Sequence, residues 1–118
     1  MSTAEPHEDL PVFVAWVEFI KWLLPATEKF PKRVRFTLSS LIDNLALDVV
    51  EELVEARYSR HKAEYLKKIN LKLERLRVLL RLCHDTQVLP HRSYEFAARS
   101  LDEVGRMVGG WIKQQEGR

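Results

Sequence analysis

The stretch from Lys62 to Cys83 constrains the fold of this chain more than any other. Its apolar residues recur at alternating intervals of three and four, at Leu66, Ile69, Leu73, Leu76, Leu80 and Cys83. This spacing places all six side chains on one face of an α-helix, in the heptad pattern of helices that pack at shallow angles against other helices. No stretch of the chain alternates with the period of a β-strand, so we predict an all-α fold.

The same predicted helix carries a second apolar strip on its far side. Leu71, Val78 and Leu82 lie roughly 160–170° around the helix from the centre of the core face. A surface helix of a small monomer needs only one apolar face. We therefore expect this strip to contact another subunit.

Basic side chains flank the two apolar faces of this helix. Arg77 and Arg81 lie one turn apart on one flank, and Lys68, Lys72 and Arg75 form the other. The planar guanidinium group suits bidentate contacts to phosphate. No aromatic side chain is interleaved with these residues, so nucleic acid is expected to bind there through backbone phosphates rather than by base stacking.

Charge is unevenly distributed along the chain, although the net charge is only +2. Residues 57–81 contain nine Lys or Arg against two Glu, whereas residues 37–56 contain five acidic residues and no basic one. This pattern fits a directed contact with an anionic partner, and it equally fits a solvated basic face that the neighbouring acidic helix neutralises. The second predicted helix begins with Lys32, Arg33 and Arg35, which oppose the helix dipole and hint at a ligand for that charge.

Four helices with short connections predict an antiparallel up-down-up-down bundle. Pro31 and Pro90 mark two of the breaks, whereas no glycine or proline marks the junction between the second and third helices. One domain over residues 9–116 is expected, after a loose tail at 1–8. The second helix keeps helical spacing throughout, at Val34, Leu38, Leu41, Ile42, Leu45, Val49, Leu53 and Ala56. The predicted helices span about residues 9–29, 31–59, 61–85 and 91–115.

The sequence offers no recognisable catalytic or cofactor-binding motif. The single cysteine, Cys83, lies on the core face and is expected to be an inert packing residue. No metal-ligand spacing relates the four histidines, so neither metal nor cofactor is expected. Carboxylate pairs such as Glu51 and Glu55 keep open the alternative of a bundle enzyme with a carboxylate metal site. The N-terminus is not a signal peptide and the most apolar window is too short to span a bilayer, which predicts a cytoplasmic protein without a membrane partner.

Three glycines fall inside the fourth predicted helix. Gly105, Gly109 and Gly110 each cost the helix up to about 1 kcal/mol relative to alanine. Gly105 and Gly109 share a face, where the missing side chains let another backbone or a large ring approach closely. Close helix packing, within the chain or between chains, is the expected role of all three.

Three stretches together resemble a known protein family. They are EKFPK and RFTL within residues 24–38, LRVLLRL at 76–82 and DEVGRMVGGWI at 102–112. In their order and spacing they resemble the accessory variability determinant (Avd) proteins of diversity-generating retroelements. These belong to a wider group of bacterial four-helix-bundle proteins related to those encoded in ribosomal-RNA intervening sequences.

The resemblance implies a homopentameric barrel of four-helix bundles with a non-enzymatic role. Such a protein would bind the retroelement reverse transcriptase and its template-repeat RNA, and would support the error-prone complementary-DNA synthesis that diversifies a target gene. Arg77 and Arg81 match the basic positions of the family, and helix geometry adds Lys68, Lys72 and Arg75. The alternative is a four-helix scaffold that binds a protein partner and no nucleic acid.

Overall fold

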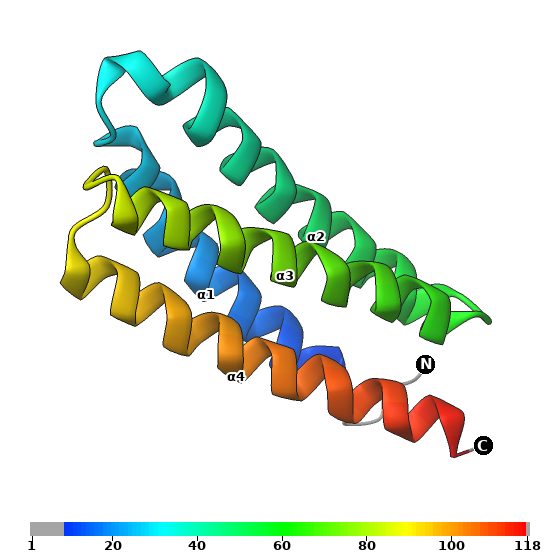
Figure 1. The fold of residues 1–118 in the computed structure, drawn as a ribbon. Helices are drawn as coiled ribbons and strands as arrows, with labels where there is room; N and C mark the ends of the chain where they lie inside the picture. The colour runs from blue at the N-terminus through cyan, green and yellow to red at the C-terminus, as the bar shows by residue number, and fades with distance from the viewer. Residues whose placement is uncertain (1–8, 118) are drawn as a thin grey trace.

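The computed structural model describes residues 9–117, and the predicted tail at 1–8 lies outside them. The described part of the chain is helical and contains no strand, which confirms the all-α prediction (Figure 1). None of its helices combines the length and apolar character needed to cross a bilayer. Its elements are α1 (Asp9–Glu28), a 3₁₀ turn η1 (Lys32–Val34), a π-helical turn η2 (Arg35–Ser39), α2 (Ser40–Tyr58), α3 (Lys62–Asp85) and α4 (His91–Glu116).

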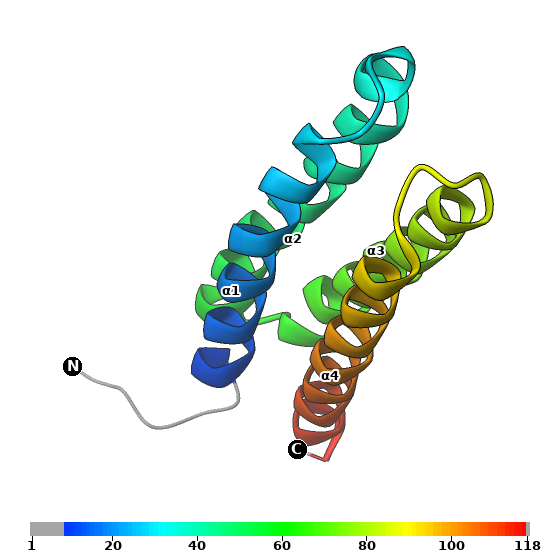
Figure 2. The same ribbon diagram turned by 90° about the vertical axis from the view of Figure 1, so that its left-hand side faces the viewer.

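The four long helices form the predicted bundle. Each packs against the next along the chain and α4 packs back against α1, which closes the ring of neighbours. Two views at right angles show the α1–α2 and α3–α4 hairpins side by side (Figures 1 and 2). The bundle measures 46 × 20 × 20 Å, so the helices run along its length.

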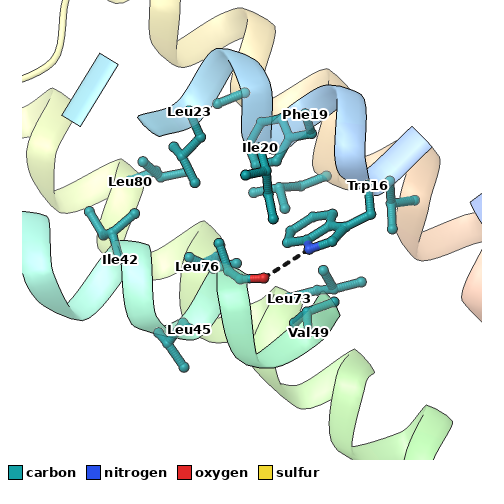
Figure 3. Close-up of a cluster of buried hydrophobic side chains, with 14 of the residues drawn as sticks. Trp16, Phe19, Ile20, Leu23, Ile42, Leu45, Val49, Leu73, Leu76 and Leu80 are labelled. Atoms are coloured by element: carbon teal, nitrogen blue, oxygen red, sulfur yellow. Dashed lines mark hydrogen bonds between the residues drawn. The ribbon is translucent and has the colours of Figure 1, made fainter. Parts of the chain in front are cut away.

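The core is built around the predicted apolar face of α3. All six of its residues are at most 1% exposed. From α1, Trp16 reaches into the same core and its indole N–H donates a 2.9 Å hydrogen bond to the carbonyl oxygen of Ala46 in α2 (Figure 3). A buried indole needs such a partner for its polar N–H group, so this bond fixes α1 against α2.

The start of the second predicted helix differs from the expectation of one regular helix over 31–59. The chain forms η1 and η2 first, and the N–H group of Ser40 bonds to the carbonyl of Arg35 across a π turn. A π turn adds a residue to one helical turn and rotates the remainder of the helix about its axis. Ser39 is buried beside α1 and donates its hydroxyl proton to the carbonyl of Thr27 at 3.2 Å. Leu41, which was expected on the buried stripe, is 48% exposed and lies at the edge of that stripe, where it lines an open groove.

The junction between α2 and α3 is closed by a lysine side chain. The Nζ atom of Lys62 donates hydrogen bonds to the carbonyl oxygens of Ala56 at 3.0 Å and Arg57 at 2.6 Å. These carbonyls lie in the last turn of α2, where they lack partners within the helix. This side-chain cap ends α2 at a boundary that no glycine or proline marks in the sequence.

The Cys83 thiol is expected to resist modification while the protein is folded. It is fully buried, and burial raises its pKa to about 11, so the reactive thiolate is scarce. At pH 8 we expect Ellman's reagent to react at least about a hundredfold more slowly with native protein than with urea-unfolded protein. Rapid stoichiometric labelling of protein with full helical circular dichroism would contradict this placement.

Candidate partner-binding surface

Arg77 lies between α3 and α4 rather than on the open surface. Its Nη2 atom donates a 3.2 Å hydrogen bond to the carbonyl oxygen of Leu101. Its other nitrogens pair with Glu74 at 2.9 Å and with Asp102 at 3.4 Å. A Cβ atom at Gly105 would lie 2.8 Å from Nη2, so glycine leaves the room that the guanidinium group occupies. Arg77 thus fastens α3 to α4.

The three helical glycines differ in how close their neighbours lie. At Gly105 the close neighbour is the Arg77 side chain, not the helix backbone or aromatic ring that we expected. At Gly109 and Gly110 nothing within residues 9–117 comes within 4 Å of an added Cβ atom. For these two, close packing between chains stays a prediction.

Lys72 is held inside the bundle as well. Its Nζ atom lies 2.7 Å from Oε2 of Glu52 in α2, and the two side chains are only 19% and 14% exposed. The other carboxylate oxygen of Glu52 is buried and has no hydrogen-bond partner among the described residues. This ion pair joins α2 to α3 and leaves Lys72 little capacity for an external ligand.

The other three predicted binding residues present their charge to solvent. Lys68 extends over the ring of Tyr65, with Nζ 5.4 Å from the ring centroid. Arg75 lies at the edge of an open groove of about 470 Å³ between α2 and α3. Nε of Arg81 lies 3.3 Å from Asp85, whose charge raises the pKa of the guanidinium group. The structure therefore separates two basic residues that brace the bundle from three that face outward.

The three residues of the predicted oligomer contact are exposed on the outer face of α3. Leu71, Val78 and Leu82 are 54%, 62% and 46% exposed. We call these three residues the α3 strip. Val78 also lines the open groove, beside Leu41 of α2. Within the described chain nothing covers the strip, and its contact with another subunit stays a prediction.

A second apolar surface, which the sequence reasoning missed, lies on the α1 side of α2. Leu47, Val54 and Tyr58 are exposed there, and we call them the α2 patch. Val54 and Tyr58 line a small cavity of about 120 Å³ together with Phe13 of α1. Their spacing of seven and four residues places all three on one helix face, which is the signal that identifies them in the sequence.

A basic turn lies at one end of the bundle, where α1 leads into η1 and η2 (Figure 1). Lys29, Lys32, Arg33 and Arg35 are all exposed, and Phe36 beside them is 90% exposed. We call residues 29–36 the basic turn. Within the described chain none of its four cations pairs with a carboxylate, and Arg35 only approaches the carbonyl oxygen of Glu28 at 3.5 Å. In the sequence, this surface is indicated by the positive charge at the start of the second predicted helix, where the helix dipole favours negative charge.

Arg77 and Arg81 are expected to respond differently to truncation. Arg77→Ala removes three contacts between or within helices and should lower the free energy of unfolding by about 1–2 kcal/mol. Arg81→Ala removes a surface ion pair with Asp85 from a side chain that is 64% exposed and should leave the urea midpoint nearly unchanged. Urea unfolding followed by circular dichroism measures both. Equal midpoints for the two variants would show that Arg77 does not brace the bundle.

Comparison with known proteins agrees with this architecture. A sequence model of the family described as bAvd-like matches residues 15–115, a span that reaches from α1 to α4. No curated protein matches the chain. Within residues 9–117 no three His, Cys, Asp or Glu side chains gather in a way that could hold a metal ion. The match covers most of the chain and confirms the family predicted from the three stretches, which is one of accessory proteins rather than a known enzyme family: the chain belongs to the bAvd-like family.

Proposed function

We propose that this protein is the accessory subunit of a diversity-generating retroelement. It binds the reverse transcriptase and the template-repeat RNA, and it supports mutagenic complementary-DNA synthesis without catalysing a reaction itself. Membership of the bAvd-like family supports the role. The observation that carries the RNA contact is the basic turn, whose four exposed cations have no carboxylate partner within the described chain.

The chemistry of the basic turn suits a single-stranded nucleic acid. Lysine and arginine neutralise backbone phosphates and release counterions, which supplies sequence-independent affinity. The exposed ring of Phe36 offers a platform on which a base can stack. Arg81, Arg75 and Lys68 add outward-facing positive charge along α3, where they can extend the path of the RNA or contact an acidic surface of the enzyme.

A ring of five chains is the proposed assembly. The α3 strip and the α2 patch lie on different faces of the bundle, and both expose apolar side chains. When one patch of a subunit contacts a different patch of the next, the contact is heterologous, and it forms a closed ring if the rotation between neighbours closes. The number five rests on the family resemblance.

The proposal is tested by removing two cations of the basic turn. We expect Arg33→Ala with Arg35→Ala to weaken binding of a fluorescent template-repeat RNA by roughly tenfold or more in anisotropy titrations. The slope of log affinity against log salt should become shallower by about 1.4, because two phosphate contacts are lost.

The matched control is Arg99→Ala with Arg106→Ala, which removes two exposed arginines from α4. This control should retain the wild-type affinity and salt slope. If the basic-turn variant binds RNA as the wild type does, the RNA does not lie there. If the wild-type protein binds no RNA but co-purifies with the reverse transcriptase, the protein-interaction scaffold is the better description.

A further inference from the structure

An open polar pocket lies at the corner where α1 leads into α2, and it shares Arg35 with the basic turn (Figure 1). Its volume of about 340 Å³ falls within the range of ordinary ligand sites, about 300–1,000 Å³. The π turn η2 supplies Arg35 and Ser39 to its wall, and π turns occur frequently at functional sites. The other lining residues come from the end of α1 and the start of α2.

The hydroxyl groups in this pocket donate their protons within the chain. Ser39 donates to the carbonyl oxygen of Thr27 at 3.2 Å, and Ser40 donates to the carbonyl oxygen of Arg35 at 3.1 Å. Thr27 donates to Oδ1 of Asp43 at 2.7 Å. The hydroxyl groups therefore offer a ligand lone pairs rather than donors.

The carboxylate of Asp43 keeps unused acceptor capacity. Within residues 9–117 only Thr27 donates a hydrogen bond to it, and no donor reaches Oδ2. Burial raises the pKa of Asp43 above its ordinary value, and the hydrogen bond from Thr27 offsets part of this effect. A partly desolvated carboxylate with free lone pairs gains more from an added N–H donor than a fully hydrated one does.

Arg35 is the available donor of the pocket. Its guanidinium group is exposed, and Nη2 approaches only the carbonyl oxygen of Glu28, at 3.5 Å. No carboxylate of the described chain forms an ion pair with it, although Asp43 lines the same pocket. The pocket thus combines an unused carboxylate acceptor with a guanidinium donor, and a matching ligand carries donors beside an acceptor.

Guanine has this pattern on its Watson–Crick edge. It presents two adjacent donors, the N1–H and N2–H groups, beside the O6 acceptor, and the two donors match the two oxygens of a carboxylate. Adenine and cytosine present one amino group on this edge, and uracil presents one N–H group. An unpaired base exposes the edge to a protein, whereas a paired base does not.

We propose that this pocket takes an unpaired guanine base of the RNA bound at the basic turn. The carboxylate of Asp43 accepts the N1–H and N2–H groups, and Arg35 donates to O6. The inference rests on the proposed RNA contact and adds base selectivity to it. A basic side chain of a protein partner also carries paired N–H donors, but the four cations of the basic turn repel it.

Anisotropy titrations with a fluorescent uridine tract that carries one central guanosine test the pocket. We expect the wild-type chain to bind this strand about tenfold more tightly than the same strand with adenosine, because a bidentate base contact discriminates on this scale. The strand with inosine, which lacks the N2 amino group, should bind with intermediate affinity. Comparing strands on one protein separates base selectivity from phosphate attraction, which all three strands share.

Asp43→Asn should abolish the preference for guanosine, because an amide offers one acceptor oxygen where the carboxylate offers two. The variant is isosteric and keeps an oxygen for the Thr27 hydrogen bond, so its circular dichroism should match the wild type. Asp48→Asn is the matched control. It removes the same charge from an exposed position of α2 outside the pocket, and it should retain the preference.

The possible results separate this inference from the proposed function. A guanosine preference that survives in Asp43→Asn would place the base elsewhere and overturn the inference. Equal binding of the guanosine, inosine and adenosine strands by the wild type would overturn it too, and would leave the RNA contact of the basic turn intact. If the wild type binds none of the strands, the proposed RNA contact fails and the guanine pocket fails with it. If Asp43→Asn loses the reverse transcriptase while no strand is preferred, the pocket holds a basic side chain of the enzyme instead.

Discussion

Replacing Leu71 and Val78 of the α3 strip with glutamate is expected to convert the assembled protein into folded monomers. Both side chains point away from the core of their own chain and are 54% and 62% exposed, so the bundle itself should lose little by the change. In an assembled ring the same positions would be desolvated. Placing unpaired charges in such an interface is strongly unfavourable.

Light scattering after gel filtration measures the outcome. The double variant should elute at the mass of one chain, 13.9 kDa, with the circular dichroism of the wild type. Asn70→Glu is the control, because Asn70 is exposed on another face of α3 and should leave the assembly intact. A double variant that keeps the wild-type mass would exclude the strip as a subunit contact.

Mixing two monomeric variants distinguishes the type of contact. If the α3 strip meets the α2 patch, Tyr58→Glu should also yield monomers, since Tyr58 is 79% exposed. A mixture of the Tyr58→Glu chain with the Leu71→Glu, Val78→Glu chain then retains one intact contact and should form a dimer. An isologous contact, in which the strip meets itself, gives no such complementation.

Lys72→Met should destabilise the bundle by on the order of 3 kcal/mol at neutral pH, because it leaves the carboxylate of Glu52 largely buried without its cation. Urea unfolding followed by circular dichroism measures the loss as a lower midpoint. The double variant Glu52→Met, Lys72→Met removes both charges and should recover to within about 1 kcal/mol of the wild type. A single variant as stable as the wild type would mean that water, rather than Lys72, stabilises the carboxylate.

The sequence predicted the architecture well because the apolar spacing of α3 is unambiguous. The face from Leu66 to Cys83 is buried throughout, and the fourth helix occupies His91–Glu116 against an expected 91–115. The roles of the basic residues were harder to predict. Whether Arg77 reaches Leu101, 24 residues away, depends on the rotation and separation of two helices, and nothing in local spacing specifies these.

The π turn explains why the second predicted helix does not begin as one regular helix at residue 31. Periodicity extrapolated from Ile42 back to Val34 assumes 3.6 residues per turn, and one added residue shifts that phase. The bond from Ser39 to the carbonyl of Thr27 in α1 favours the shifted arrangement. A single serine in a helical pattern gives no warning of this, since its role depends on a partner twelve residues away in another helix.

The antiparallel arrangement also determines how the protein can be handled. α1 begins and α4 ends at the same end of the 46 Å bundle, whereas the basic turn lies at the opposite end (Figure 1). A fluorophore, affinity tag or surface tether attached beyond α4 therefore sits roughly one bundle length from the basic turn. Immobilised chains would present the basic turn to an analyte in solution, so a biosensor built on this protein need not place its anchor near the surface it reports on.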